Sequence, residues 1–161
     1  MNRKSTSSPI KPLPSDTEAE QSVIGSLLGF GGDKVYDAIS SDIGQEMFYD
    51  SRYALLFEAI RNLRTKNKPF DEVSVLAEIR SMGKQEEVSP AFIAETSSNG
   101  HDLYHVVEHA LFVKQKYLQR EAVKLSHILQ SRAFDDTEDV GDVLFDTGKE
   151  LEKLMGTLVG N

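Results

Sequence analysis

Apolar residues recur every three or four positions along most of this chain, and that spacing predicts amphipathic helices. The first stripe consists of Ala19, Val23, Ile24, Leu27 and Leu28, and glycines end it from position 29 onward. Comparable stripes predict four further short helices, over about residues 33–43, 51–66, 72–82 and 90–96. No stretch shows the strict alternation of a half-buried strand. The pattern therefore predicts an all-α fold.

Several predicted helix starts carry residues that typically cap helices. Ser15 and Glu18 have the spacing of a capping box, in which the hydroxyl and the carboxylate each accept a hydrogen bond from a free backbone amide. Asp71 precedes the fourth helix and Thr137 precedes the last one. We therefore predict structural caps at Ser15, Glu18, Asp71 and Thr137. Glu20 lies two residues from Glu18, on a different face of the helix, and is predicted to be exposed to solvent.

Beyond residue 100 the predicted helices become much longer. No Gly or Pro interrupts residues 102–132, and a helix of this length measures about 45 Å. After a turn at residues 134–136, a second stripe continues to about residue 158, with leucines spaced as in a coiled-coil seam. Basic residues mark the first long helix and acidic residues the second, which favours antiparallel pairing. They are Lys114, Lys116, Arg120 and Lys124, against Asp139, Asp142, Asp146, Glu150 and Glu152.

The predicted architecture is a compact helical bundle over residues 15–100, followed by a long antiparallel helical hairpin over residues 101–158 of the same domain. Residues 1–14 contain three prolines and three basic residues but no acidic residue, and they are predicted to form a flexible basic tail. Residues 159–161 are predicted to begin a linker that is truncated.

A hairpin of two helices cannot bury all its apolar residues, because each helix hides only one stripe against the other. Contiguous apolar surface of this kind is typical of a contact with another chain. We therefore predict self-association through the hairpin; the alternative is that the hairpin folds back on the bundle. The residues predicted to form the oligomer interface are Val113, Tyr117, Leu118, Leu125, Leu129, Leu144, Leu151, Leu154 and Leu158.

Composition narrows the classes of partner. The 161 residues carry a formal net charge of −8, which disfavours DNA binding because contacts with phosphate need Lys and Arg. Tyr117, Arg120 and Lys124 could form a basic patch with an aromatic ring, but Tyr117 lies on the apolar stripe, which favours helix packing. The sequence has no cysteine, so it has no disulfide or thiolate metal site, and it fits a cytoplasmic protein. No apolar run predicts a membrane span.

Two motifs resemble catalytic signatures. His105, Glu108 and His109 match the H-x-x-E-H pattern of one class of zinc peptidases. In that class the third ligand comes from far downstream in a much larger domain, so we interpret the histidines as the polar face of the long helix. The glycine-rich segment 29–34 lacks the spacing of a phosphate-binding loop and is predicted to be a turn. We expect no catalytic residue, cofactor site or metal site in this chain.

Three motifs occur in a fixed order: PSDTEAEQSVIGSLL at residues 14–28, FYDSRYALLFEAIRNL at 48–63 and KPFDEVSVLAEI at 68–79. KQKYLQRE follows at 114–121. Together they resemble the N-terminal domain of DnaB-type replicative DNA helicases. The matching positions are Pro14, Glu18, Ala19, Glu20, Val23, Ile24, Gly25, Ser26, Leu27, Leu28, Phe48, Tyr49, Leu56, Phe57, Ala59, Ile60, Pro69, Phe70, Asp71, Val73 and Ser74. Residues 29–32 and 95–103 depart from the family pattern.

The resemblance implies an assembly role. In similar proteins this domain forms the collar of a hexameric ring, in which paired hairpins give dimers arranged around a three-fold axis. The collar receives the C-terminal helicase-binding domain of primase and influences loading, so primase, a helicase loader and a second copy of the chain are the expected partners. ATP hydrolysis, with ATP and Mg²⁺ as cofactors, would belong to an ATPase domain that this chain lacks.

Two other functions remain open from the sequence. One is a stand-alone phage or plasmid adaptor that binds a helicase or primase. The other is a helical DNA-binding regulator, which would show a steep dependence of DNA affinity on salt concentration.

Overall fold

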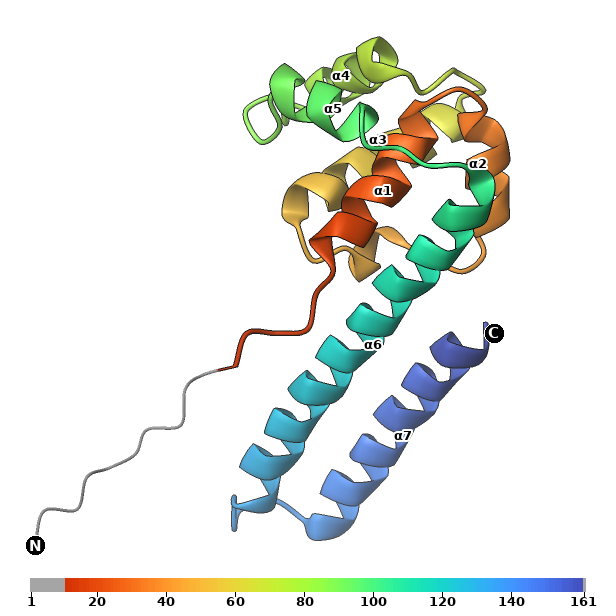
Figure 1. The fold of residues 1–161 in the computed structure, drawn as a ribbon. Coiled ribbons are helices and arrows are strands. Elements are labelled where there is room, and N and C mark those ends of the chain that lie inside the picture. Colours follow the sequence, from red (N-terminus) through yellow and green to blue (C-terminus); the bar gives the residue numbers. More distant parts are fainter. Residues whose placement is uncertain (1–10, 161) are drawn as a thin grey trace, which may run out of the picture.

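The computed structural model describes residues 11–160, and every regular element in that range is a helix (Figure 1). In chain order the elements are α1 (Thr17–Leu28), α2 (Gly32–Ile39), the 3-10 helix η1 (Gln45–Met47), α3 (Ser51–Thr65), α4 (Glu72–Ser81), α5 (Pro90–Ser97), α6 (Leu103–Ala133) and α7 (Val140–Val159). The predicted all-α architecture, a bundle followed by a long antiparallel hairpin, is confirmed. Most of the predicted tail over residues 1–14 lies outside the described residues.

Within that range, none of the helices combines the length and the apolar character needed to cross a bilayer.

The predicted cap of α1 is wrong by one residue. Asp16 is the N-cap, and its carboxylate accepts a hydrogen bond from the Ala19 amide at 3.0 Å. Ser15 precedes the cap, and Glu18 lies exposed in the first helical turn. An aspartate caps a helix as well as a serine does, and the neighbouring residue therefore takes the role predicted for Ser15. Asp71 is the N-cap of α4, where its carboxylate accepts from the Ser74 amide at 2.8 Å.

The cap predicted at Thr137 is also wrong. Asp139 caps α7 by accepting a hydrogen bond from the Asp142 amide at 3.0 Å. The amide and the hydroxyl of Thr137 instead donate to the Asp135 carboxylate, at 2.9 and 2.6 Å. This local turn uses the Thr137 side chain before the helix begins, which is the competition that Asp and Thr side chains typically offer to helix formation.

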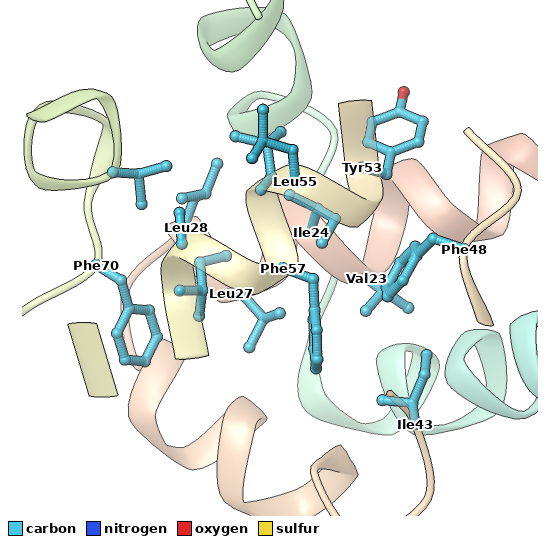
Figure 2. Close-up of a cluster of buried hydrophobic side chains, with 14 of the residues drawn as sticks. Val23, Ile24, Leu27, Leu28, Ile43, Phe48, Tyr53, Leu55, Phe57 and Phe70 are labelled. Carbon is cyan, nitrogen blue, oxygen red and sulfur yellow. The ribbon is translucent and has the colours of Figure 1, made fainter. Parts of the chain in front are cut away.

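The core of the bundle is built around α1. Val23, Ile24 and Leu27 are completely buried, and their helix contacts α2, α3, α5 and α6. Figure 2 shows them near Leu55 and Phe57 of α3. Phe57 and Phe48 pack with their ring centroids 5.2 Å apart in the same cluster. The apolar stripe that predicted α1 is therefore the centre of the fold rather than a surface face.

Gly25 in α1 lets α5 and the segment after it approach closely. A Cβ at this position would lie 2.3 Å from the Thr96 carbonyl oxygen and 2.9 Å from the Gly100 amide nitrogen. Those are backbone atoms that cannot move aside cheaply, so any side chain at Gly25 would push the chain apart.

The first half of α6 belongs to the bundle. Val106, Ala110 and Val113 are buried in the same core as α1, and Tyr117 packs against its edge. Val113 was predicted in the oligomer interface, and this prediction is wrong, because only 1% of its surface is exposed within one chain. Helical spacing shows that a residue lies on an apolar stripe, but it does not show which element covers that stripe.

The second half of α6 leaves the bundle and pairs with α7. Figure 1 shows α7 running antiparallel along the distal part of α6 and ending about midway along it. Arg132 joins the two helices at the far end, with its guanidinium 2.6 Å from the Glu138 carboxylate and 3.0 Å from that of Asp146. At the near end, Thr157 and Gly160 lie beside Lys114 and Tyr117 of α6.

Candidate interaction surface of the helical hairpin

One side of α7 is apolar and uncovered. Val140, Leu144, Leu151, Met155 and Leu158 follow one another at intervals of four, seven, four and three residues, so they form a single stripe along the helix. Between 48% and 69% of each of these residues is exposed. Val143, by contrast, is buried. We call the five exposed residues the α7 stripe. It is the strongest candidate for a contact with another chain.

The predicted interface residues fall into three groups. Leu144, Leu151 and Leu158 are exposed on the α7 stripe. Leu118, Leu125, Leu129 and Leu154 are half-buried, and of these Leu125 and Leu154 line the groove between α6 and α7. Val113 and Tyr117 belong to the bundle, as described above.

Sequence reasoning left Val140 and Met155 out of the predicted interface. Both follow the same spacing as the leucines of the stripe, so the signal for them was present. Met155 lies four residues after Leu151, and Val140 lies four residues before Leu144.

The charges of α6 and α7 pair less than predicted. Among the described residues, the ion pair that joins the two helices links Arg132 to Asp146 of α7. The pKa of Arg132 is raised by its hydrogen bonds to Asp146 and to Glu138 in the turn before α7. Lys124 pairs with Glu121 on its own helix at 3.2 Å. Lys114 has a buried side chain, and its Nζ lies 3.9 Å from Asp42 in the loop after α2. Lys114 and Lys124 therefore do not pair with the acidic residues of α7 as predicted.

Arg120 ties the base of the hairpin to the bundle. Its side chain is buried and donates hydrogen bonds to the carbonyl oxygens of Pro14 at 2.9 Å and Met47 at 2.7 Å. The guanidinium also lies 5.4 Å from the centroid of the Tyr49 ring. This geometry argues against a role of Arg120 in the basic nucleic-acid patch considered above, because the side chain is buried and both Nη atoms donate to backbone carbonyl oxygens.

Glu20 completes this buried polar site, and the prediction that it is exposed is wrong. Only 1% of Glu20 is exposed, and its carboxylate accepts hydrogen bonds from the amides of Tyr49 at 2.9 Å and Asp50 at 3.0 Å. Burial raises the pKa of Glu20, while the two amides and the positive charge of Arg120 pull it in the opposite direction. The carboxylate therefore fixes the chain where α3 begins.

The histidines of the H-x-x-E-H motif have local structural partners. Nδ1 of His105 lies 2.8 Å from the carboxylate of Asp102, the N-cap of α6. Nδ1 of His109 lies 2.6 Å from the hydroxyl of Ser22 on α1. In the part of the chain that the structure describes, no group of three His, Cys, Asp or Glu side chains has an arrangement suited to a metal ion.

A comparison with family models matches residues 12–115 to the DnaB-like helicase N-terminal domain. The chain belongs to this family. The matched region covers the bundle and the first part of α6, and it includes the three motifs on which the resemblance was based. The recognition from sequence is thereby confirmed.

Similar curated proteins carry the same family name. The replicative DNA helicase DnaB of Pasteurella multocida is 29% identical over 152 residues, which are 89% of this chain and 32% of that protein. The replicative DNA helicase DnaB of Rhodothermus marinus is 28% identical over 142 residues, which are 88% of this chain and 15% of that protein. The chain therefore spans about a third or less of the length of these relatives.

A solved structure supports the fold assignment. The crystal structure of the N-terminal domain of DnaB helicase from Mycobacterium tuberculosis superposes with a TM-score of 0.78, at 22% sequence identity. The match covers 88% of this chain and 99% of that one. The hairpin thus belongs to the fold of a DnaB N-terminal domain.

Proposed function

We propose that this chain is the assembly domain of a replicative DNA helicase and that it self-associates through the hairpin. The observation that carries the proposal is the α7 stripe. A helix that packs on one neighbour only leaves most of its apolar side chains in water, and each large side chain that is then buried contributes about 1.5–3 kcal/mol. Contact with a second hairpin would cover these side chains.

Membership of the family supports a wider role. Its relatives are named as replicative DNA helicases, and the chain corresponds to their N-terminal part. As the resemblance implies, the assembled domains would form the collar of the helicase ring and would bind the C-terminal domain of primase or a helicase loader. Isothermal titration with a purified primase C-terminal domain tests this second contact independently of self-association.

Replacing Leu151 by Asp tests the self-association. Leu151 is 48% exposed at the middle of the α7 stripe, so the substitution places a charge in the proposed contact without opening a core. We expect the mass measured by light scattering to fall toward that of a monomer, while helical circular dichroism is retained. The matched control is Ser131→Asp, at an exposed position of α6, and it should keep the wild-type mass. A wild-type protein that stays monomeric at high concentration would remove the basis of the proposal.

A further inference from the structure

Three of the four histidines of the chain lie together where α6 begins. His101 precedes the N-cap Asp102, and His105 and His109 lie in the first and second turns of the helix. The ring centroids of His101 and His109 are 5.3 Å apart, those of His101 and His105 are 6.1 Å apart, and those of His105 and His109 are 6.4 Å apart. The three rings therefore form a compact group at one end of α6.

The separation of these rings is close to that of histidines around a shared metal ion. With Zn–N distances of about 2.0–2.1 Å and tetrahedral angles, the ring centroids of two histidines on one zinc ion lie roughly 5 Å apart. The pair His101 and His109 already has this spacing, and the other two pairs exceed it by roughly 1 Å. Within the described residues no three side chains are yet arranged to hold an ion, so the rings must close by this distance. His101 and His105 are exposed, which leaves their side chains free to rotate.

Two of the rings are already oriented through their Nδ1 atoms. Nδ1 of His105 lies 2.8 Å from the carboxylate of Asp102, and Nδ1 of His109 lies 2.6 Å from the hydroxyl of Ser22. A histidine that binds a metal usually donates its second ring N–H to an oxygen acceptor such as a carboxylate, which fixes the tautomer and leaves the lone pair of Nε2 for the ion. Histidines four residues apart on one helix face are also a common pair of zinc ligands.

The charges around the rings favour a cation. His101 and His109 line a cleft of about 270 Å³ together with Asp16 and Glu18 at the start of α1, and the residues that line it include neither lysine nor arginine. Glu18 is exposed, and its carboxylate or a water molecule can supply a fourth ligand. The N-terminus of α6 carries about half a positive charge, which the full negative charge of Asp102 outweighs.

We propose that His101, His105 and His109 bind one Zn²⁺ ion. The ion joins the segment between α5 and α6 to the first two turns of α6, and the proposal replaces the expectation from sequence that the chain has no metal site. The site differs from that of the zinc peptidases considered above. Glu108, the acidic residue of the H-x-x-E-H motif, lines a groove with Val107 on another side of α6, so it is not placed to activate a water molecule on the ion.

Calorimetric titration of the untagged chain with zinc chloride tests the proposal, and we expect one zinc ion per chain. His101→Gln and His105→Gln each remove one ligand at an exposed position, so both variants should fold. We expect the zinc affinity of each to fall by about tenfold or more. The matched control is His127→Gln, at an exposed position of α6 outside the cluster, and it should keep the wild-type affinity. A wild-type chain that binds no zinc, or equal affinities for all four proteins, would overturn the proposal.

Asp102→Asn tests the part played by the oriented ring. Asparagine caps a helix as well as aspartate does, so α6 should keep its start. Loss of the negative charge beside Nδ1 of His105 should lower the zinc affinity by about tenfold. An unchanged affinity would show that Asp102 does not orient a ligand of the ion, against the proposed geometry.

Thermal unfolding followed by circular dichroism tests whether the ion binds the folded chain. Zinc at about a hundred times its dissociation constant should raise the unfolding midpoint of the wild type by about 5–10 °C. The same zinc concentration should have a much smaller effect on His105→Gln. An unchanged midpoint in the wild type would show that zinc binds the unfolded chain equally well, and it would overturn a site built by the fold.

Discussion

The bundle and the hairpin of this domain bury their apolar residues to very different extents. In the bundle, α1 is surrounded by neighbouring helices, and Val23, Ile24 and Leu27 are inaccessible to water. In the hairpin, α7 contacts mainly α6, and Val143 is its one buried apolar residue. The bundle is therefore complete within one chain, while the hairpin leaves a surface that a second molecule can cover.

Polar groups show the same contrast. The base of the hairpin is fixed by Arg120 and the nearby Glu20, whose buried side chains make hydrogen bonds to the backbone. Toward the far end the ion pairs of Arg132 are solvent-accessible, and such pairs typically contribute about 0–1 kcal/mol. Apolar residues at the same helical spacing thus form a core in the bundle and an exposed surface, available for an interface, in the hairpin.

The difference in burial between the two regions is tested most directly by replacing one leucine in each region by alanine. Leu27→Ala in the core should lower the free energy of unfolding by about 2–5 kcal/mol, because it leaves a cavity at a fully buried site. Leu144→Ala on the exposed stripe should change it by less than about 0.5 kcal/mol. Urea denaturation followed by circular dichroism, at protein concentrations too low for association, measures both. Equal losses would show that α7 is as well packed as α1.

A smaller effect is expected from removing the charge at the base of the hairpin. Arg120→Met deletes the hydrogen bonds to the carbonyls of Pro14 and Met47 and removes a positive charge near Glu20. We expect a loss of about 2–3 kcal/mol in the free energy of unfolding. Lys124→Met is the matched control on an exposed part of α6, and its effect should stay within about 0.5 kcal/mol. If the two variants behaved alike, Arg120 would not join the regions.

The smallest expected effect is a dependence of stability on pH through Glu20. Its pKa is raised in the folded protein, so the native state holds the proton more tightly than the unfolded chain does. The contribution of Glu20 to stability therefore increases as the pH falls from neutrality through the native pKa toward the ordinary glutamate value. Glu20→Gln lacks this contribution. We expect the stability difference between wild type and Glu20→Gln to shift toward the wild type on acidification, measured by urea denaturation at several pH values.

Carboxyl groups whose pKa is lowered in the folded protein have the opposite effect on the pH dependence of stability, and they provide an internal check. Asp50 and Asp71 have pKa values held down by the Arg52 side chain and by the backbone amide of Ser74, respectively. Their stabilisation is present above the ordinary aspartate pKa and is lost as the pH falls through the lowered values. If Glu20 made no such contribution, the plots of unfolding free energy against pH would have the same shape for the wild type and for Glu20→Gln.

The helices themselves were predictable because the spacing of apolar residues and the residues that end a helix are both local features of the sequence. The stripe from Ala19 to Leu28 and the uninterrupted run over residues 102–132 needed no knowledge of distant contacts. The predicted helix over residues 33–43 is an exception, since α2 ends at Ile39 and Ile43 is buried in the loop that follows. Ile43 is buried by tertiary packing, and the spacing of apolar residues does not distinguish such a buried loop residue from the last residue of a longer helix.

The environment of single side chains was less predictable. Glu20 was expected in water because its spacing placed it off the apolar stripe, but α1 is covered on most sides, so Glu20, Ser22 and Ser26 are buried as well. Val113 was expected at an interface because the stripe of α6 is continuous, although the bundle covers its first half. Both errors arise because the sequence does not show which element packs on a given face of a helix. The three-dimensional arrangement is needed to show it.

The uninterrupted course of α6 has a mechanical consequence. About 20 Å of this rod, from Glu121 to Ala133, extends beyond Arg120, the last residue of α6 that is fixed to the bundle. A tilt of roughly 5° about the embedded part would displace the free end by about 2 Å. A small change in the packing around Glu20 and Arg120 would therefore be enlarged at the distal end of the hairpin.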